Sequence, residues 1–225
     1  MKPVCIFIVI MAFFLSGNVK VQSDTSVIYL DSNMRVVPVG KAFYGEAIVH
    51  QNKMYLTALV DLKTKSTVYT GSYKDKNLSM PEGLFEYFTD KIRIMRGYYH
   101  NGKQVGTWKK WDKEGLLVDS VGFDNNGGVL AEAKYSYHTN KTLWRLVVED
   151  DQDQKTSKEF DSSGILVSQG KFTSGDGETF IYYPNGKIKM HSLFQNNSRT
   201  LFEFFDEAGK KYNQQEYEDY IKAKP

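Results

Sequence analysis

A short phrase of apolar and polar positions recurs along most of the chain: an aromatic strand, a polar turn that closes on glycine, and a second strand. The turn glycines Gly164, Gly186 and Gly209 lie 22 and 23 residues apart, a period typical of one supersecondary unit per repeat. Aromatic and β-branched residues favour strands, and glycine or asparagine accepts the positive φ of tight hairpin turns. The pattern therefore predicts an all-β fold, a meandering antiparallel sheet of repeated β-hairpins. Copies of the phrase lie at residues 83–91, 106–117, 135–141, 159–166, 178–188 and 200–210.

The repeats are expected to occupy residues 81–212, and the segment before them has a different pattern. Residues 24–80 contain strand-like runs without the recurring phrase. This part is therefore predicted as an N-terminal β segment, either a distinct cap or a divergent pair of repeats. Within the repeats, residues 143–148 place apolar side chains on both faces of a strand, which predicts a central strand covered on two sides.

The C-terminal end has helical rather than strand periodicity. Tyr217, Tyr220 and Ile221 follow the i, i+3, i+4 spacing of one helix face. Residues 213–225 are therefore predicted as a short helical tail, which is able to cover an edge strand of the sheet.

The N-terminus has the pattern of a secretory signal peptide. Lys2 provides a positive charge, and Val4–Leu15 form an apolar run of twelve residues. This run is shorter than the roughly 20 apolar residues that a membrane-spanning helix needs, so no membrane span is expected. Residues 1–23 are predicted to be removed, which makes Asp24 the first mature residue; cleavage nearer Gly17 is the alternative. The protein is expected to be exported, to a periplasmic or extracellular location.

Cysteine usage narrows the possible chemistry. The single cysteine, Cys5, lies inside the predicted signal peptide, so the mature chain is expected to have no disulfide and no thiol chemistry. A bacterial lipoprotein would need a cysteine at the position of Asn18, so no lipid anchor is predicted.

Charge argues against nucleic-acid binding. Removing Lys2 and Lys20 from the 29 basic residues leaves 27, which balances the 27 acidic residues. Nucleic-acid binding proteins gain much of their affinity by neutralising phosphates and show a basic excess or a basic face. No nucleic-acid partner is expected.

The repeats resemble a known family, the variant form of the MORN repeat. Residues 98–115 carry the closest match, with a tyrosine pair, an Asn-Gly turn, a second strand leading into Gly-x-Trp, and a further turn glycine. The resemblance covers roughly residues 83–210 and extends to YwqK-like antitoxin-type proteins, exported bacterial chains of the Bacteroides type. It implies a meandering sheet of hairpins that contacts other molecules, and it carries no catalytic residues.

Metal and cofactor chemistry has no strong sequence signal. The four histidines are widely separated, without the short spacings of a zinc site. The acidic run at residues 149–153 offers oxygen ligands for calcium, but it lacks the later glycine and glutamate of an EF-hand, and a solvated hairpin tip is the favoured interpretation. No metal and no cofactor are predicted. The chain is not expected to be an enzyme; a hydrolase would require a pocket with two close carboxylates, one of them with a raised pKa.

The aromatic residues are the candidate binding residues. Rings of this kind usually pack on those of adjacent hairpins, yet consecutive strand residues point to opposite faces, so one ring of each doublet lies away from its partner. If one sheet face is open, these rings form an aromatic stripe for a protein or glycan partner. The function predicted is a non-catalytic binding or scaffolding module at the cell envelope; the alternative is an immunity or antitoxin-type protein that neutralises a toxin outside the cytoplasm. The candidate residues are Tyr98, Tyr99, Trp108, Trp111, Tyr182, Tyr183, Phe204 and Phe205.

Overall fold

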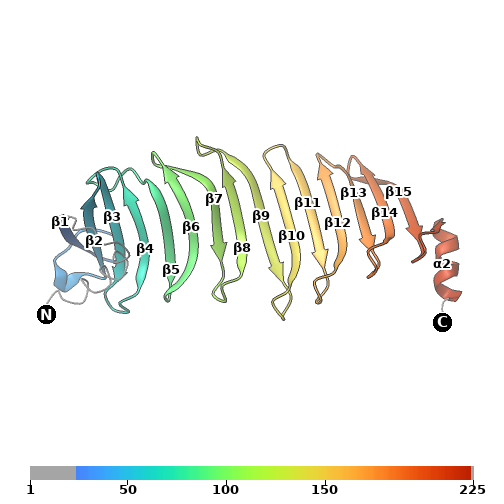
Figure 1. Ribbon diagram of the computed structural model, residues 1–225, viewed down its shortest axis with the longest axis horizontal. Coiled ribbons are helices and arrows are strands. Elements are labelled where there is room, and N and C mark those ends of the chain that lie inside the picture. Colours follow the sequence, from blue (N-terminus) through green and yellow to red (C-terminus); the bar gives the residue numbers. More distant parts are fainter. Residues whose placement is uncertain (1–23, 224–225) are drawn as a thin grey trace. The chain divides into compact units, whose positions relative to one another are not determined.

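A computed structural model describes residues 24–223 of the chain, so the predicted signal peptide lies outside the described residues. The chain divides into two compact units, and within each unit the strands follow one another in the order of the sequence (Figure 1). Unit 1 comprises the described residues up to Gly115 together with Phe123–Gly128, and unit 2 comprises Leu116–Gly122 and the residues from Val129 onward.

Unit 1 is an antiparallel sheet in which strands pair in the order of the sequence. A short 3-10 helix, η1 (Val39–Lys41), lies in the connection between its first two strands. The strands are β1 (Asp24–Leu30), β2 (Tyr44–Gln51), β3 (Met54–Asp61), β4 (Thr67–Tyr73), β5 (Gly83–Thr89), β6 (Ile92–His100) and β7 (Lys103–Trp111).

Unit 2 repeats the same plan, and a single helix follows its last strand. The predicted all-β fold, an open meandering antiparallel sheet of hairpins with a short C-terminal helix, is confirmed. The elements are β8 (Leu117–Phe123), β9 (Val129–Tyr137), β10 (Leu143–Asp150), β11 (Gln154–Phe160), β12 (Leu166–Thr173), β13 (Asp176–Tyr182), β14 (Ile188–Gln195), β15 (Ser198–Phe205), β16 (Lys211–Tyr212) and α2 (Gln214–Ala223).

The turns use the chemistry that the repeat pattern predicted. Gly164 and Gly209 close their turns with φ of 84° and 95°, values that residues with a Cβ adopt only under strain. In the first of these turns the Asp161 carboxylate accepts the N–H groups of Ser163 and Ile165 at 2.8 and 3.0 Å. The turn is thus held by its own aspartate, and two side chains of the preceding turn also donate hydrogen bonds to its backbone.

Each sheet is a single layer, because its strands make their main contacts with neighbouring strands. The consequence is clearest in β10, which was predicted to be covered on both faces. That prediction is wrong: Trp144 is 44% exposed, and Leu146, Val147 and Val148 are only half-buried. The position of β10 between β9 and β11 agrees with a central strand, but none of the described residues forms a second layer over its faces.

The predicted C-terminal helix is confirmed as α2. It begins with a reciprocal cap, in which Asn213 Oδ1 accepts the N–H of Glu216 and Glu216 Oε2 accepts the N–H of Asn213, both at 2.9 Å. Tyr217 is buried and stacks on Phe204 of β15, with ring centroids 4.4 Å apart. The helix therefore covers the sheet beside its last strands. Within residues 24–223, α2 and the other helical segment are too short or too polar to cross a bilayer.

Candidate functional site

The doublet Tyr98–Tyr99 splits between the two faces of unit 1, as its strand position predicts. Tyr99 packs edge-on against Phe85 and Trp108, with centroid distances of 4.8 and 4.9 Å. Tyr98 lies on the opposite face, and 47% of its surface is exposed. The two neighbouring rings therefore have different surroundings: one belongs to the packing of the sheet, and the other is free to contact a partner.

Six rings on one face of unit 1 form what we call the aromatic cluster. Phe85 and Trp108 at its centre are buried, with 2% and 4% exposure, whereas the tyrosines around them are half-buried. Neighbouring rings lie 4.8–6.5 Å apart and include edge-on pairs, the arrangement that aromatic quadrupoles favour. The members are Tyr69, Tyr73, Phe85, Tyr87, Tyr99 and Trp108.

Glycines in the strands make room for the two buried rings. A Cβ at Gly71 would lie 2.3 Å from the Phe85 ring, and one at Gly97 would lie 2.0 Å from the Trp108 indole. Each ring thus lies flat across the backbone of the neighbouring strand, where a side chain would otherwise stand. Trp108 also donates its indole N–H to the carbonyl of Tyr98 at 3.1 Å, which satisfies the polar atom of a buried residue.

A buried carboxyl group adjoins the aromatic cluster. Glu46 of β2 is only 5% exposed and accepts a hydrogen bond from the Tyr69 hydroxyl. Burial raises the pKa of Glu46 above its usual value, and the hydrogen bond from Tyr69 opposes that rise. Burial also raises the pKa of the Tyr69 and Tyr87 hydroxyls, which therefore stay protonated and remain hydrogen-bond donors.

A groove of about 430 Å³ lies beside β1, on the face of unit 1 that carries the aromatic cluster. We call it the edge groove. Asp24, His50 and Tyr55 stand directly opposite one another across β1, β2 and β3. The His50 and Tyr55 rings stack at 4.6 Å, which gives a flat aromatic wall. The groove is lined by Asp24, Thr25, Ser26, Ile28, Ile48, His50, Tyr55, Lys76, Asn77 and Leu78.

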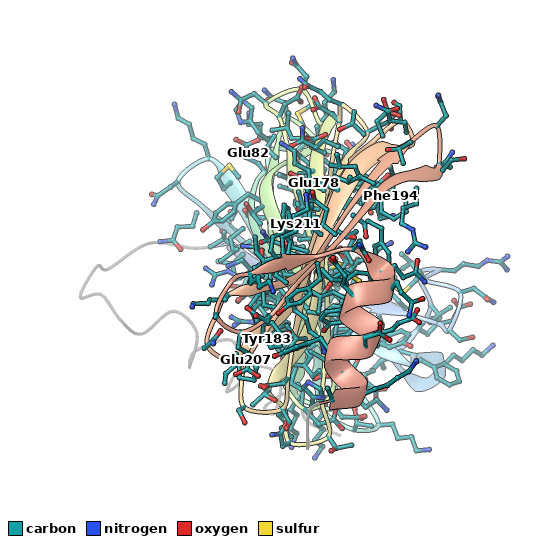
Figure 2. All side chains as sticks on the ribbon, turned by 90° about the vertical axis from the view of Figure 1, so that its right-hand side faces the viewer. Glu82, Glu178, Tyr183, Phe194, Glu207 and Lys211 are labelled. Carbon is teal, nitrogen blue, oxygen red and sulfur yellow. The ribbon has the colours of Figure 1, made fainter. Side chains whose placement is uncertain are left out.

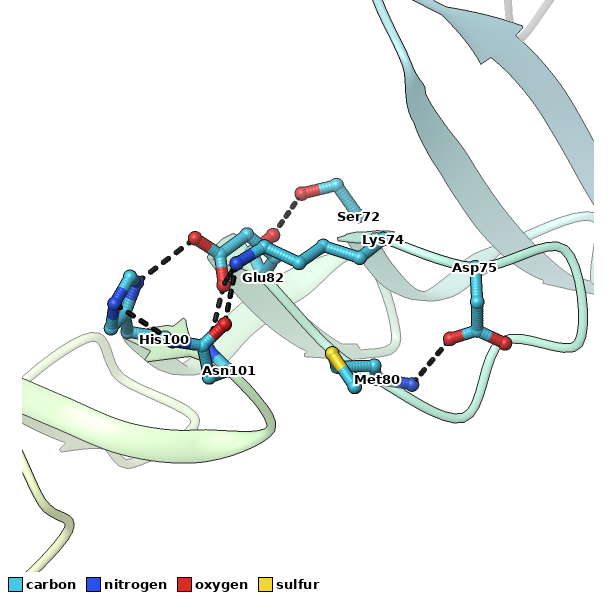
Figure 3. A network of polar contacts seen from close by, with 7 residues as sticks. All are labelled: Ser72, Lys74, Asp75, Met80, Glu82, His100 and Asn101. Atoms are coloured by element: carbon cyan, nitrogen blue, oxygen red, sulfur yellow. Dashed lines mark hydrogen bonds and ion pairs between the residues drawn. The ribbon is translucent and has the colours of Figure 1, made fainter.

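The loop between β4 and β5 forms one rim of the edge groove and is held by hydrogen bonds (Figure 3). The Asp75 carboxylate accepts the N–H groups of Asn77, Ser79 and Met80 at 2.7–3.2 Å. These bonds hold Leu78 at a φ of 57°, a left-handed conformation that costs about 1 kcal/mol in a residue with a Cβ. The rim is therefore built before any ligand arrives.

Glu82 links the far end of this loop to the turn between β6 and β7 (Figure 3). Its carboxylate accepts the Asn101 N–H at 2.7 Å, contacts His100 Nδ1 at 3.0 Å and pairs with Lys74 at 3.3 Å. Desolvation acts to raise the pKa of Glu82, but the hydrogen bonds from Asn101, His100 and Lys74 outweigh it and hold that pKa below its usual range. His100 is thus one of the residues that connect the loop to this turn.

Trp111 lies at the end of β7 and is half-buried. The Arg93 guanidinium lies 4.8 Å from its ring centroid, and Glu86 accepts a hydrogen bond from Arg93 at 3.0 Å. This ring is thus engaged in a cation–π contact with a side chain of the neighbouring strand β6.

The predicted aromatic residues of unit 2 are mainly packing residues. Tyr183 is buried beside α2, donates its hydroxyl to the carbonyl of Phe205 at 2.8 Å and approaches the Tyr217 hydroxyl at 3.5 Å (Figure 2). Phe204 lies under Tyr217, while Tyr182 and Phe205 are half-buried. Tyr183 is buried here, as Trp108 is in unit 1. Neither ring therefore contributes to an open binding surface.

Sequence reasoning missed a cluster around His191 in unit 2. The His191 ring stacks on Phe180 at 4.5 Å with an angle of 2° between the planes, and its two nitrogens face Glu203 at 3.1 Å and Glu178 at 3.3 Å. Lys211 pairs with Glu203 as well. The hydrogen bonds from Lys211 and His191 hold the pKa of Glu203 below its usual range. These residues lie 12 and 13 positions apart in the sequence, and the register of β13, β14 and β15 brings them together.

Neither catalysis nor metal binding gains support from these clusters. Glu178 and Glu203 face the two nitrogens of one imidazole, so the His191 ring lies between the two carboxylates. At residues 149–153 the Asp150 carboxylate is used by the N–H groups of Gln152 and Gln154, so the acidic run closes a hairpin tip. In the part of the chain that the structure describes, no group of three or more His, Cys, Asp or Glu side chains is arranged to hold a metal ion.

The fold and the site define a repeat protein whose hairpins form single-layer sheets. The model of a family described as MORN repeat variant matches residues 175–196, which span the β13–β14 hairpin. This match supports a MORN-repeat protein, and MORN repeats are generally non-catalytic binding or scaffolding motifs. No curated protein matches the chain.

Proposed function

We propose that this protein is an exported, non-catalytic binding or scaffolding module that contacts a protein or glycan partner at the cell envelope. Export rests on the signal-peptide pattern of residues 1–23. The closer assignment, to YwqK-like antitoxin-type proteins of Bacteroides-like bacteria, is part of the same proposal and rests on the repeat phrase at residues 98–115.

The aromatic cluster of unit 1 carries the proposal. Its four tyrosines are half-buried on a face that no second layer of the unit covers. Tyrosine is enriched at protein interfaces because it offers a large apolar area together with a hydroxyl group that forms hydrogen bonds. The Tyr69 hydroxyl already donates to Glu46, and burial raises the pKa of the Tyr73 and Tyr87 hydroxyls, which therefore stay protonated.

The surface is also rigid, which lowers the cost of binding. Each tyrosine contacts at least one other ring of the cluster, and Phe85 and Trp108 fix the centre. A preorganised surface loses little side-chain entropy when a partner binds. We therefore assign the contact surface to this face rather than to the opposite one, which carries Tyr98.

Co-purification of the tagged mature protein from its native envelope tests this function. We expect one protein or glycan species to be retained by the wild type and lost with Tyr87→Ser, which removes a half-buried ring from the cluster. Tyr98→Ser, on the opposite face of the same unit, is the matched control and should retain the species. Circular dichroism confirms that both variants are folded. Retention of the same species by all three proteins would contradict the assignment of the surface.

A further inference from the structure

The first strand of unit 1 has an open edge over most of its length. β1 pairs with β2 on one side through all of Asp24–Leu30. On its other side the following loop folds back, so that Val37 donates its N–H to the carbonyl of Tyr29 at 2.9 Å and Leu30 forms a β-bridge with Val36. Within residues 24–223 this loop is the sole segment on that side, and it stops short of Asp24–Ile28. The backbone groups of this stretch are thus available to a further strand.

The edge groove lies immediately beside this open edge. Asp24, Ser26 and Ile28 are alternate residues of β1, so they point to the same face, and all three line the groove. Ile48 and Tyr55 continue the groove inward across β2 and β3. A strand added to β1 would direct every second side chain over this groove. Strand addition uses these two features together: main-chain hydrogen bonds give affinity, and pockets for alternate side chains give specificity.

Exposed apolar side chains and two cations lie around the edge, together with the Asp24 carboxylate in the lining of the groove. Val36 is 72% exposed and Met34 is 49% exposed, both in the loop that abuts the open edge. Arg35 between them, and Lys76 on the rim of the groove, make no ion pair with any residue of the described chain. The nearby Asp31 carboxylate is occupied by the N–H groups of Asn33 and Arg35. A complementary ligand is apolar at the groove and acidic beside these cations.

The groove needs little rearrangement to receive a side chain. Asp75 and Glu82 fix its loop rim, and the stacked His50 and Tyr55 rings fix its wall. Its volume of about 430 Å³ is enough for one or two bulky apolar side chains. Rigid walls spare the ordering entropy that a flexible site loses on binding.

We propose that the open edge of β1 binds an extended, acidic peptide segment of a partner protein, which joins the sheet as an additional strand and places a bulky apolar side chain in the edge groove. This inference deepens the proposed function and rests on it only in that the partner is a protein. The aromatic cluster is a separate part of the same face, so the two contacts are tested independently.

Selection from a displayed random-peptide library against the mature protein, residues 24–225, tests the proposal. We expect enriched peptides with a bulky apolar residue flanked by Asp or Glu. Ile48→Arg, which puts a charge into the groove, should weaken these peptides at least about tenfold, because the apolar side chain then meets a group that must stay hydrated. Val129→Arg is the matched control at an exposed position of β9 and should leave binding unchanged.

Ile48→Arg could weaken binding simply by misfolding, so a second, charge-reversed variant tests the proposal independently. In the double variant Arg35→Glu and Lys76→Glu the groove is intact, and we expect the same library to yield basic instead of acidic peptides. The proposal is overturned if no peptide is enriched, if Ile48→Arg has no effect, or if reversal leaves peptide charge unchanged. A dimer that Ile48→Arg dissociates would overturn it too, by making a second copy of this chain the occupant. Failure here with retention of a Tyr87-dependent partner would leave the proposed function standing.

Discussion

Trp108 lies flat across the backbone of Gly97, so that a Cβ on this glycine would stand 2.0 Å from Cδ2 of the indole. The bare backbone of Gly97 therefore makes room for the indole of Trp108, the largest buried ring in unit 1. In a single-layer sheet, where no second layer supplies packing, a ring of one strand covers the bare backbone of the next. The same relationship holds between Phe85 and Gly71.

Gly97→Ala should destabilise unit 1 by about 2–3 kcal/mol, because the new methyl group forces Trp108 out of its place. Urea unfolding followed by tryptophan fluorescence measures the loss. Gly40→Ala is the control within the same unit, since nothing lies within 4 Å of a Cβ there. We expect the control to change stability by less than about 1 kcal/mol. Equal effects of the two substitutions would contradict the packing argument.

The Tyr98–Tyr99 doublet gives a second comparison. Tyr99→Ala removes a ring that packs on Phe85 and Trp108, and we expect it to cost about 2–3 kcal/mol, somewhat less than a fully buried aromatic residue. Tyr98→Ala removes an exposed ring and should change the free energy of unfolding by no more than about 0.5 kcal/mol. Chemical denaturation of both variants measures the two losses of unfolding free energy. A larger loss for Tyr98→Ala than for Tyr99→Ala would show that Tyr98, not Tyr99, lies on the packed face.

Glu46 makes stability depend on pH in an unusual direction. Its pKa is raised in the folded protein by burial, so its contribution is fully present below the unfolded value near 4.5 and is lost as pH rises through the folded pKa. Glu46→Gln keeps the contact with Tyr69 and cannot ionise. We therefore expect the thermal stability of the variant to increase relative to wild type as pH rises above 4.5. A difference that is constant with pH would contradict a buried, titrating carboxyl.

Glu203 should show the opposite dependence. Hydrogen bonds from Lys211 and His191 lower its pKa, so its contribution is present above the unfolded value and is lost as pH falls through the folded pKa. Glu203→Gln should destabilise unit 2 at neutral pH, and the difference from wild type should shrink below pH 4.5. Thermal unfolding across this range measures it. Lys211→Met offers a control, because it weakens the same pair while leaving the carboxylate in place.

Local features of the fold were predictable because they depend on short stretches of sequence. The turn glycines Gly164 and Gly209 mark hairpins, since their positive φ is a property of the turn itself. Tyr217 and Tyr220 marked the helix by their spacing. The split of Tyr98 and Tyr99 between faces followed from strand geometry alone.

Features that depend on register or on layering were not predictable. The register of the β6–β7 pairing shifts between Arg96 and Tyr98, beside the place where Trp108 lies over Gly97. The His191 cluster arises because β13, β14 and β15 align residues 12 and 13 positions apart. The exposure of Trp144 reflects the absence of a second layer over β10, which apolar patterning alone does not reveal.

The central claim, that the aromatic cluster of unit 1 contacts a partner, is tested most directly by photo-crosslinking in the native envelope. A benzophenone amino acid replaces Tyr87 in one protein and Tyr98, on the opposite face, in another. We predict a discrete covalent adduct from position 87 and none from position 98. Adducts from position 98 alone, or from neither position while both proteins are folded and exported, would contradict the account.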